Sequence, residues 1–209
     1  MSRLTVIDHP LVQHKLALLR DAATPFPTFR RVLRETTWLL AYEATRHLRV
    51  EATPIETPLE KMTAHTLPER GPVLISILRA GNGLVDGLMD VMPEAAVGQL
   101  GLVRNPKTLQ PEEYYCKLPA AIEERQVILA DPMLATGGST VAAIDRLREK
   151  GVRDLVFLCL VAAPEGVAAL QAAHPEVPVF TAALDRELNE KGYILPGLGD
   201  AGDRIYGTE

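Results

Sequence analysis

The sequence of 209 residues has few of the features that mark secreted, membrane or zinc-binding proteins. Its two cysteines lie in different settings, Cys116 in a polar segment and Cys159 in an apolar run, which argues against a disulfide framework and a cysteine-ligated zinc site. The longest apolar run, residues 155–163, is far shorter than the ~20 residues that a membrane-spanning helix needs. No apolar signal core follows the N-terminus, so we expect a cytoplasmic protein with no membrane partner.

Basic residues are fewer than acidic ones. The chain has 22 Lys and Arg against 27 Asp and Glu, a formal net charge of -5, so we expect no large nucleic-acid surface and no nucleic-acid partner. The five histidines show no metal-ligand spacing, and no protein metal site is expected. Apolar residues make up 47% and charged residues 23% of the chain, which is typical of a globular domain.

The apolar pattern predicts an α/β fold. Residues 10–20 and 28–48 have helical periodicity, with Thr28 as a candidate N-cap. From residue 72 onward, apolar runs of strand length alternate with helix-like segments at 83–92, 139–150 and 164–173; the runs are 72–78, 95–103, 126–130, 155–163 and 177–184. This alternation indicates a mostly parallel sheet flanked by helices on both faces.

Two segments do not fit the alternation. The link 104–124 is polar and long for a compact domain, and we expect it to be a flexible flap. The tail 189–209 contains five glycines, and we expect no helix there. No linker or repeat divides the chain, so we expect one domain over 1–209, made of an N-terminal helical extension (1–70), a core (71–183) and a Gly-rich C-terminal hood (184–209).

The stretch VILADPMLATGGST, residues 127–140, is typical of a phosphate site. An apolar strand would deliver Asp131 to the carboxyl edge of the sheet, where open α/β sheets bind ligands. Gly137 and Gly138 would let the backbone approach a ligand, and the N–H groups of the following helix start would bind an anion. No lysine is present for a Walker motif. Taken alone, the stretch also fits an ordinary strand–turn–helix link.

A second glycine cluster, GNGLVDG at residues 81–87, invites comparison with dinucleotide-binding loops. Its third glycine, Gly87, comes one residue late for that motif, and Arg104 stands at the next strand end, where the motif places an acid. The sequence therefore does not favour a dinucleotide site.

Residues 127–139 resemble the motif that binds 5-phosphoribosyl 1-pyrophosphate (PRPP) in type I phosphoribosyltransferases. Pro132 replaces the usual second acid, as in the uracil phosphoribosyltransferase family. The similarity to that family continues over residues 9–16, 77–87, 101–111, 161–170 and 188–208. The resemblance implies the type I phosphoribosyltransferase fold and an enzyme that transfers the phosphoribosyl group of PRPP to N1 of uracil, giving UMP and pyrophosphate in pyrimidine salvage.

The resemblance also implies the site residues. The implied catalytic residues are Arg79, Arg104, Asp131 and Asp200. PRPP would contact these four and Pro132, Met133, Leu134, Ala135, Thr136, Gly137, Gly138 and Ser139, and uracil would contact Ile194, Gly199, Asp200 and Ala201. From the residues alone, Arg79 and Arg104 follow two strands, where paired guanidinium groups suit a pyrophosphate; either one alone also fits an exposed arginine at a strand end.

Further properties follow from the resemblance. Mg²⁺ would arrive with PRPP, GTP is a candidate effector, and a homodimer or homotetramer is expected. In the flap, Tyr114, Tyr115 and Lys117 would help to exclude water, or would serve the structure only. Two other functions stay open at this point: a PRPP- or UMP-sensing regulator that binds RNA, which should show a basic face, and the same enzyme class acting on a purine.

Overall fold

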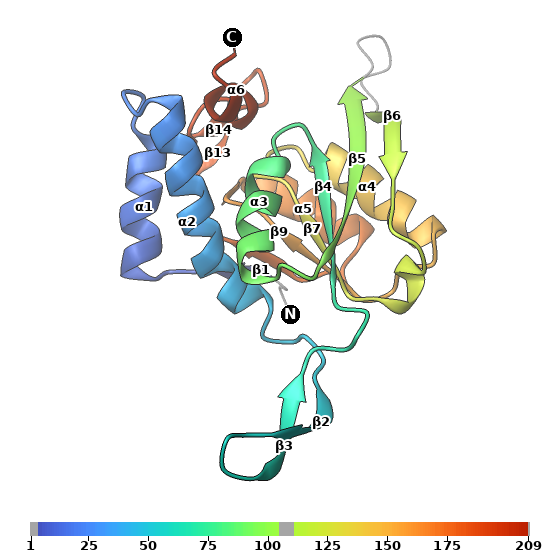
Figure 1. Cartoon of the computed structure of the whole chain (residues 1–209). Coiled ribbons are helices and arrows are strands. Elements are labelled where there is room, and N and C mark those ends of the chain that lie inside the picture. Colours follow the sequence, from blue (N-terminus) through green and yellow to red (C-terminus); the bar gives the residue numbers. More distant parts are fainter. Residues whose placement is uncertain (1–3, 105–110, 209) are drawn as a thin grey trace.

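The computed structural model describes residues 4–104 and 111–208, without the side chains of Arg104 and Pro111. Its centre is a seven-stranded sheet in the order β1-β11-β9-β7-β4-β5-β6 (Figure 1). Neighbouring strands pair in parallel except β5 and β6, which are antiparallel. The strands are β1 Leu4–Val6, β4 Val73–Leu78, β5 Ala96–Arg104, β6 Pro111–Lys117, β7 Val127–Ala130, β9 Leu155–Leu158 and β11 Val179–Thr181.

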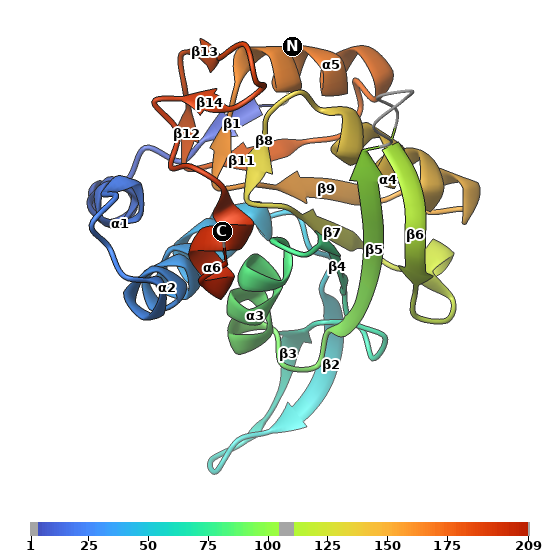
Figure 2. The ribbon, with the colours of Figure 1, turned by 90° about the horizontal axis from the view of Figure 1, so that it is seen from above.

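Helices cover both faces of this sheet (Figures 1 and 2). One face carries α1 (Pro10–Arg20), α2 (Phe26–Ala44) and α3 (Asn82–Val91), and the other carries α4 (Gly138–Glu149) and α5 (Pro164–Ala173). Successive residues of a strand point to opposite faces of the sheet. In β7, Ile128 and Ala130 belong to the hydrophobic core on one face, and Val127 and Leu129 belong to the core on the other. A strand that is buried on both faces appears in the sequence as an unbroken apolar run. The predicted fold class, a mostly parallel sheet flanked by helices, is confirmed.

The apolar runs bend where they leave the main sheet. A second, three-stranded parallel sheet in the order β12-β10-β8 forms beyond β7, β9 and β11. Its strands are β8 Met133–Leu134, β10 Val161–Ala162 and β12 Ala183–Leu184. The single strands predicted at 155–163 and 177–184 are therefore each two short strands. The Pro132 carbonyl accepts hydrogen bonds from the N–H groups of Leu160 (2.9 Å) and Val161 (3.0 Å), which fixes the bend.

The strand order places a topological switch point beside β4. β5 lies on one side of β4 and β7 on the other, so the chain changes direction across the sheet between them. Ligands of open α/β sheets bind in the crevice at such a point, outside the carboxyl ends of the strands. Arg79 follows β4 and Asp131 follows β7, and the two loops are neighbours at this edge.

The N-terminal 70 residues hold more than helices. β1 joins the edge of the main sheet. β2 (Glu51–Glu56) pairs antiparallel with β3 (Lys61–Thr66) in a hairpin that projects from the end of the molecule opposite its C-terminus (Figure 1). The prediction that Thr28 caps α2 was wrong. The helix begins at Phe26 after Pro25, with Pro27 in its first turn, where a missing N–H costs nothing.

The expectation of no helix in the tail was also wrong. After the antiparallel pair β13 (Glu187–Leu188) and β14 (Ile194–Leu195), residues Ala201–Tyr206 form α6. Asp200 is the N-cap, and its side chain accepts a hydrogen bond from the Asp203 N–H at 3.0 Å. Gly207 ends the helix with φ 69°. Most glycines of the tail lie outside the helix, so their number did not forbid it.

The polar link 104–124 contains β6, which pairs with β5, and the short 3-10 turn η1 (Ile122–Glu124). Residues 105–110 of the expected flap lie outside the described residues, and its mobility stays a prediction. Both cysteines are free thiols. Over residues 4–104 and 111–208, no helix has the length and apolar character needed to cross a membrane.

Candidate active site

The loop after β4 presents Arg79 at the carboxyl edge. The Arg79 side chain is 60% exposed, and its Nη2 lies 3.7 Å from Oδ1 of Asp203. The Tyr206 hydroxyl donates a hydrogen bond of 3.0 Å to the Arg79 carbonyl oxygen. Both partners belong to α6, so the C-terminal helix holds this loop.

The glycines at the end of this loop and at the start of α3 serve packing. A Cβ atom on Gly81 would lie 2.5 Å from the Ala130 carbonyl oxygen of β7. One on Gly83 would lie 2.8 Å from the Leu33 side chain and 2.9 Å from that of Ile205. These contacts seat α3 against β7, α2 and α6, and they account for the glycines that resembled a dinucleotide loop.

Asp131 follows β7, and its carboxylate accepts the Met133 N–H at 3.5 Å. Its burial raises the pKa to about 7; the Met133 N–H opposes the rise and the carboxylate of Asp200 adds to it. The effect of Asp200 agrees with the two carboxylates lying at the same edge of the sheet. Hydroxyl groups of a sugar, or water held by a cation, would stabilise the charged form of Asp131.

The loop after Asp131 leads directly into α4. The N-cap is Gly137, at φ 83°, and no side chain caps the helix. The first-turn N–H groups have no partner within a helix, so they remain for an anion. A Cβ atom on Gly137 would lie 3.0 Å from both the Ala169 Cβ and the Gly166 carbonyl oxygen of α5. The hydroxyl-bearing Thr136 and Ser139 are exposed beside it.

The C-terminal hood, residues 184–208 as described, closes over the carboxyl edge of the sheet (Figure 2). A Cβ atom on Gly192 would lie 3.8 Å from Cγ2 of Thr136, in the segment 136–139 that the sequence predicts to be a phosphate loop. One on Gly202 would lie 3.2 Å from Oδ1 of Asp200 and 3.8 Å from Nη2 of Arg79. The hood therefore touches both the phosphate loop and the Arg79 loop.

A charged network fixes the hood to α1. Arg20 donates to both carboxylate oxygens of Asp185, at 2.6 and 2.8 Å, and to the Gly197 carbonyl oxygen at 2.7 Å. The Asp185 carboxylate also accepts the Gly197 N–H at 2.8 Å. Gly197 has φ 60°, and a Cβ atom there would lie 2.1 Å from the Ile194 carbonyl oxygen. The network thus sets the turn between Ile194 and Gly199.

Arg204 makes a second attachment between the hood and α1. Its guanidinium donates to the carbonyl oxygens of Leu198 (3.0 Å) and Asp21 (2.7 Å), and lies 4.5 Å from the ring centroid of Phe29. Sequence reasoning missed Arg20, Asp185 and Arg204. The only local signal was Asp185, an acid directly after an apolar run.

The structure brings most of the predicted site residues to this edge. The segment from Pro132 to Ala135 forms the bend and β8 between Asp131 and the phosphate loop. Ile194 is buried in β14, Ala201 is buried at the start of α6, and Gly199 has φ 82°. Arg104 is the last residue of β5, and its side chain lies outside the described part of the chain.

The flap residues Tyr114, Tyr115 and Lys117 lie on β6 beside β5. A Cβ atom on Gly101 of β5 would lie 2.6 Å from the Tyr114 ring, so Tyr114 covers this glycine. That contact supports a packing role for Tyr114.

A metal ion would have to bring most of its ligands with it. Among the described residues, no three His, Cys, Asp or Glu side chains gather in a way that could hold one. Asp131 and Asp200 supply two carboxylates, which suits Mg²⁺, an ion that keeps several waters and binds through one or two carboxylates together with substrate phosphates.

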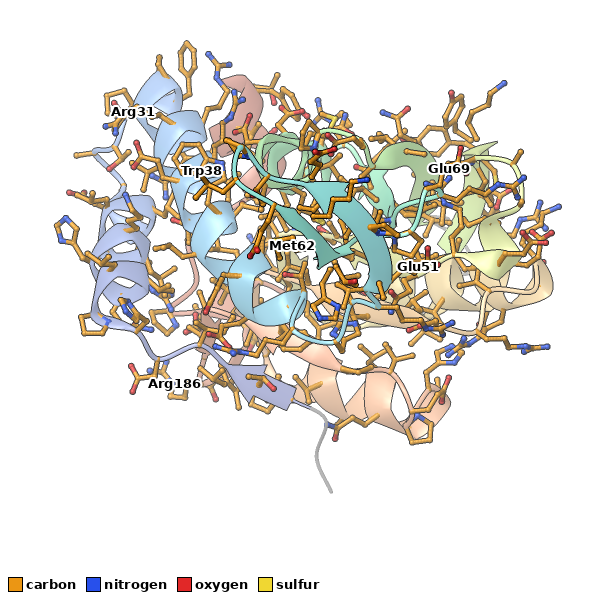
Figure 3. The ribbon with its side chains drawn as sticks, turned by 60° about the horizontal axis from the view of Figure 1, so that its bottom comes forward. Arg31, Trp38, Glu51, Met62, Glu69 and Arg186 are labelled. Carbon is orange, nitrogen blue, oxygen red and sulfur yellow. The ribbon has the colours of Figure 1, made fainter. Side chains whose placement is uncertain are left out.

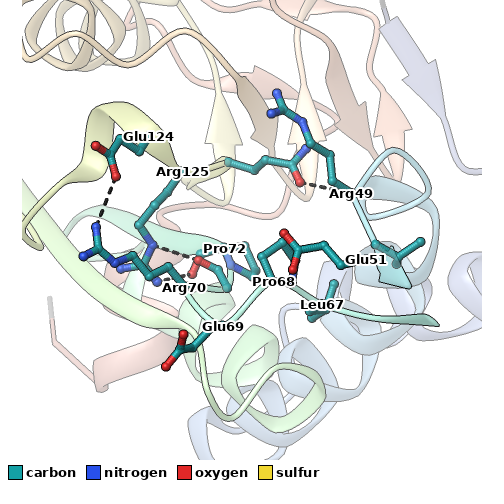
Figure 4. Close-up of a pocket in the computed structure, with 12 residues that line it drawn as sticks. Arg49, Glu51, Leu67, Pro68, Glu69, Arg70, Pro72, Glu124 and Arg125 are labelled. Atoms are coloured by element: carbon teal, nitrogen blue, oxygen red, sulfur yellow. Dashed lines mark hydrogen bonds and ion pairs between the residues drawn. The ribbon is translucent and has the colours of Figure 1, made fainter. Parts of the chain in front are cut away.

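A separate cavity of about 560 Å³ lies at the base of the β2–β3 hairpin (Figure 4). The Arg125 guanidinium donates there to the carbonyl oxygens of Gly71 (2.8 Å) and Pro72 (3.2 Å), and Arg70 pairs with Glu124 at 3.1 Å. These residues precede β4 and β7, so the cavity lies at the amino ends of the strands. None of the predicted site residues line it.

Comparison with known proteins agrees with the geometry. The sequence model of the family described as "Uracil phosphoribosyltransferase" matches residues 6–208. The chain belongs to the uracil phosphoribosyltransferase family. It is 57% identical to the uracil phosphoribosyltransferase of Acidovorax ebreus (strain TPSY) over 209 residues, 100% of both chains. It is 58% identical to that of Paracoccus denitrificans (strain Pd 1222) over 208 residues, 100% of this chain and 99% of the relative.

Solved structures support the fold. The AQ2163 protein from Aquifex aeolicus superposes with a TM-score of 0.92 at 36% identity, covering 97% of each chain. Adenine phosphoribosyltransferase from Trypanosoma brucei shares the fold alone, with a TM-score of 0.59 at 11% identity over 96% of this chain and 89% of that one. The resemblance identified in the sequence, including the type I phosphoribosyltransferase fold, is thereby confirmed.

Proposed function

We propose that the protein transfers the phosphoribosyl group of PRPP to N1 of uracil, giving UMP and pyrophosphate. The observation that carries this proposal is the meeting of three segments at one sheet edge: the Arg79 loop, the phosphate loop after β7, and the C-terminal hood. Together they offer a cation, an anion site and irregular backbone within one crevice, in a chain of the uracil phosphoribosyltransferase family.

PRPP would lie along the first two segments. The N–H groups and hydroxyls of residues 136–139 suit its 5′-phosphate. Asp131 is placed to accept hydrogen bonds from the ribose hydroxyls, with the backbone of residues 132–135 alongside. Arg79 suits the pyrophosphate, because a guanidinium is always charged and grips phosphate oxygens in pairs. By family resemblance, we assign Arg104 to the pyrophosphate of PRPP as well.

Uracil would lie under the hood. Ile194, Gly199 and Ala201 offer backbone groups, and a pocket that pairs the uracil O4 carbonyl with a fixed donor discriminates against cytosine, whose amino group would face that donor. Asp200 caps α6 through the Asp203 N–H, and the same carboxylate contributes to the raised pKa of Asp131. We therefore place Asp200 between the base and PRPP.

The reaction breaks the bond between C1 of the ribose and the pyrophosphate oxygen, which leaves with the electron pair. A bond forms between C1 and N1 of uracil, and N1 loses its proton. Because C1 becomes oxocarbenium-like, catalysis depends on alignment and on cations at the leaving group, the role of Arg79 and Arg104. Asp131 and Asp200 would hold the coordinated water of a Mg²⁺ ion bound with PRPP, and this ion would neutralise phosphate charge.

The remaining expectations are kept as proposals. We propose a homodimer or homotetramer, supported by apolar side chains exposed on α2 and the β2–β3 hairpin, including Trp38 and Met62 (Figure 3). GTP activation rests on family resemblance. PRPP is too highly charged to cross a bilayer, and we place the enzyme in the cytoplasm with its substrate.

The test is release of pyrophosphate by the purified protein with PRPP and Mg²⁺, comparing uracil, cytosine, hypoxanthine and adenine. We expect turnover with uracil alone, and loss of most of it in Arg79→Ala. Turnover with a purine would overturn the assignment of the base. Binding of PRPP or UMP without turnover of any base would overturn the enzyme and favour a regulator.

A further inference from the structure

Two side chains of α6 that the assignments above do not use face the Arg79 loop. Tyr206 donates its hydroxyl to the Arg79 carbonyl oxygen at 3.0 Å, and its ring centroid lies 5.8 Å from Cζ of the Arg79 guanidinium. Asp203 places Oδ1 3.7 Å from Nη2 of the same guanidinium. Residues three apart share one face of a helix, so both partners meet Arg79 from the same side.

Both side chains are themselves held in place. The Asp203 carboxylate accepts the Thr208 hydroxyl at 2.6 Å, and the Asp203 N–H is bound by Asp200. α6 is anchored by Arg204 and by Ile205, which is buried against the Gly83 backbone. Gly202 lies beside the Arg79 side chain: a Cβ atom there would be in ordinary van der Waals contact with Nη2, at 3.8 Å.

The distance between Asp203 and Arg79 is informative. At 3.7 Å the two groups attract each other, but the separation exceeds that of a hydrogen bond, about 2.7–3.2 Å. The N–H groups of the guanidinium thus stay available for phosphate oxygens, while their charge is drawn toward α6. Among the described residues, Asp203 is the only ion-pair partner of this exposed side chain.

We propose that Asp203 and Tyr206 are positioning residues that hold Arg79 ready for the pyrophosphate of PRPP. This role rests on the proposed function, because it assigns Arg79 to that pyrophosphate. α6 starts directly after Asp200, one of the residues that we assign to uracil. The hood that would cover the base therefore also orients the Arg79 guanidinium toward the leaving pyrophosphate. Holding the side chain beforehand removes the cost of ordering it when PRPP binds.

The main test is Tyr206→Phe, which keeps the ring over Arg79 and removes only the hydroxyl. Titration calorimetry with Mg²⁺ would measure PRPP, pyrophosphate and UMP separately on the full-length protein. UMP lacks the pyrophosphate, so it reports on the hood and the phosphate loop without Arg79. We expect about three- to tenfold weaker binding of PRPP and pyrophosphate, the effect of one hydrogen bond, and UMP binding within about twofold of wild type.

Tyr42→Phe is the matched control. Tyr42 is also an exposed helical tyrosine under an arginine, Arg46, whose Cζ lies 5.0 Å from its ring centroid, but it belongs to the last turn of α2. We expect no change in any of the three affinities. Equal weakening of UMP and PRPP by Tyr206→Phe would mean that Tyr206 only supports the hood, which would overturn the proposal.

Asp203 is tested by Asp203→Asn and Asp203→Glu. The first removes the charge with little change in shape, and we expect weaker PRPP binding with UMP binding kept; the second restores the charge and should recover most of the loss. Tighter PRPP binding in Asp203→Asn would show that the carboxylate merely repels the ligand and would contradict the assignment.

A double mutant separates positioning from other effects. In an Arg79→Ala background, Tyr206→Phe should have no further effect on PRPP affinity, because coupled residues are not additive. An additive loss would overturn the role of Tyr206. These affinities do not depend on which base is used: a wild-type protein that binds PRPP but does not use uracil would overturn the proposed function, whereas the response of Tyr206→Phe would still test the positioning of Arg79.

Discussion

Asp131 is a residue whose charge state near neutral pH is changed by the fold. Its pKa is raised from the ordinary value of about 3.9 to about 7, chiefly by burial. Below pH 7 the group is mostly neutral, and above it mostly charged. The charged form accepts the hydrogen bonds that ribose hydroxyls donate, so the unliganded protein should be only partly in the binding form at neutral pH.

We therefore predict that PRPP affinity increases with pH, reaches half of its plateau at about pH 7 and levels off near pH 8. If only the ionised form binds well, affinity at pH 6 should be about tenfold below the plateau, because each pH unit below the pKa reduces the ionised fraction tenfold. Calorimetry at saturating Mg²⁺ from pH 5.5 to 8.5 checks this. The ratio of wild type to Asp131→Asn removes the titration of PRPP itself, and a ratio that does not change with pH would contradict the prediction.

The same shift affects stability with a definite sign. A carboxyl group whose folded pKa is raised favours the folded state below its unfolded pKa, and this contribution is lost as pH rises through the folded value. Asp131→Asn should accordingly raise the melting temperature at pH 8 and have little effect at pH 4. Thermal unfolding at the two pH values measures both.

At the scale of elements, α4 offers a comparison between its two ends. Gly137 at the start and Gly151 just after the end have φ 83° and 85°. A Cβ atom on Gly151 would lie 3.1 Å from that of Glu123, and one on Gly137 would lie 3.0 Å from the backbone and a side chain of α5. Both positions favour glycine for its left-handed backbone, but only the first faces the proposed phosphate site.

Gly137→Ala and Gly151→Ala should each lower the free energy of unfolding by about 1–2 kcal/mol. Only Gly137→Ala should weaken the binding of PRPP, because backbone strain at this position displaces the N–H groups at the start of α4. Denaturant unfolding together with PRPP titration separates the two effects. Equal PRPP affinity in both variants would show that the start of α4 does not bind the phosphate.

The elements predicted correctly are those with a long local pattern. β4 and β7 are buried on both faces and α1 has a full apolar stripe, so their residues alone indicate them. α6 has six residues, too few to show a period, and depends on the Asp200 cap and on docking. β6 lies at the edge of the sheet and keeps polar, exposed side chains, so it reads as a loop.

The same reasoning divides the site residues. Arg79 and Asp131 follow strand ends, and the carboxyl edge of a parallel sheet gathers such residues by a general rule. The contact of Tyr206 with Arg79 spans 127 positions, and that of Arg20 with Asp185 spans 165. Contacts at such separations depend on how α1 and α6 pack onto the finished sheet, which no local pattern contains.

At the scale of the whole molecule, the β2–β3 hairpin stands out because it packs little against the rest of the chain. None of its residues is buried, and it projects away from the sheet at the end opposite α6 (Figure 1). Leu59 at its turn is 94% exposed, and Ile55 and Met62 are also exposed. A lone two-stranded hairpin is marginally stable in water, so we expect a second copy of the chain to cover it in the proposed oligomer.

Removing the hairpin tests this assembly. Glu51 pairs with Thr66, so its two ends are adjacent and a short Gly-Ser link can join Val50 to Leu67 in place of residues 51–66. We expect sedimentation to show a smaller assembly than the full chain forms. PRPP binding should persist, because the proposed site lies at the other end of the sheet. Leu59→Ser, which keeps the hairpin, should weaken assembly less. An unchanged mass for the shortened protein would mean that the copies meet through another surface, with the exposed face of α2 next to be tested.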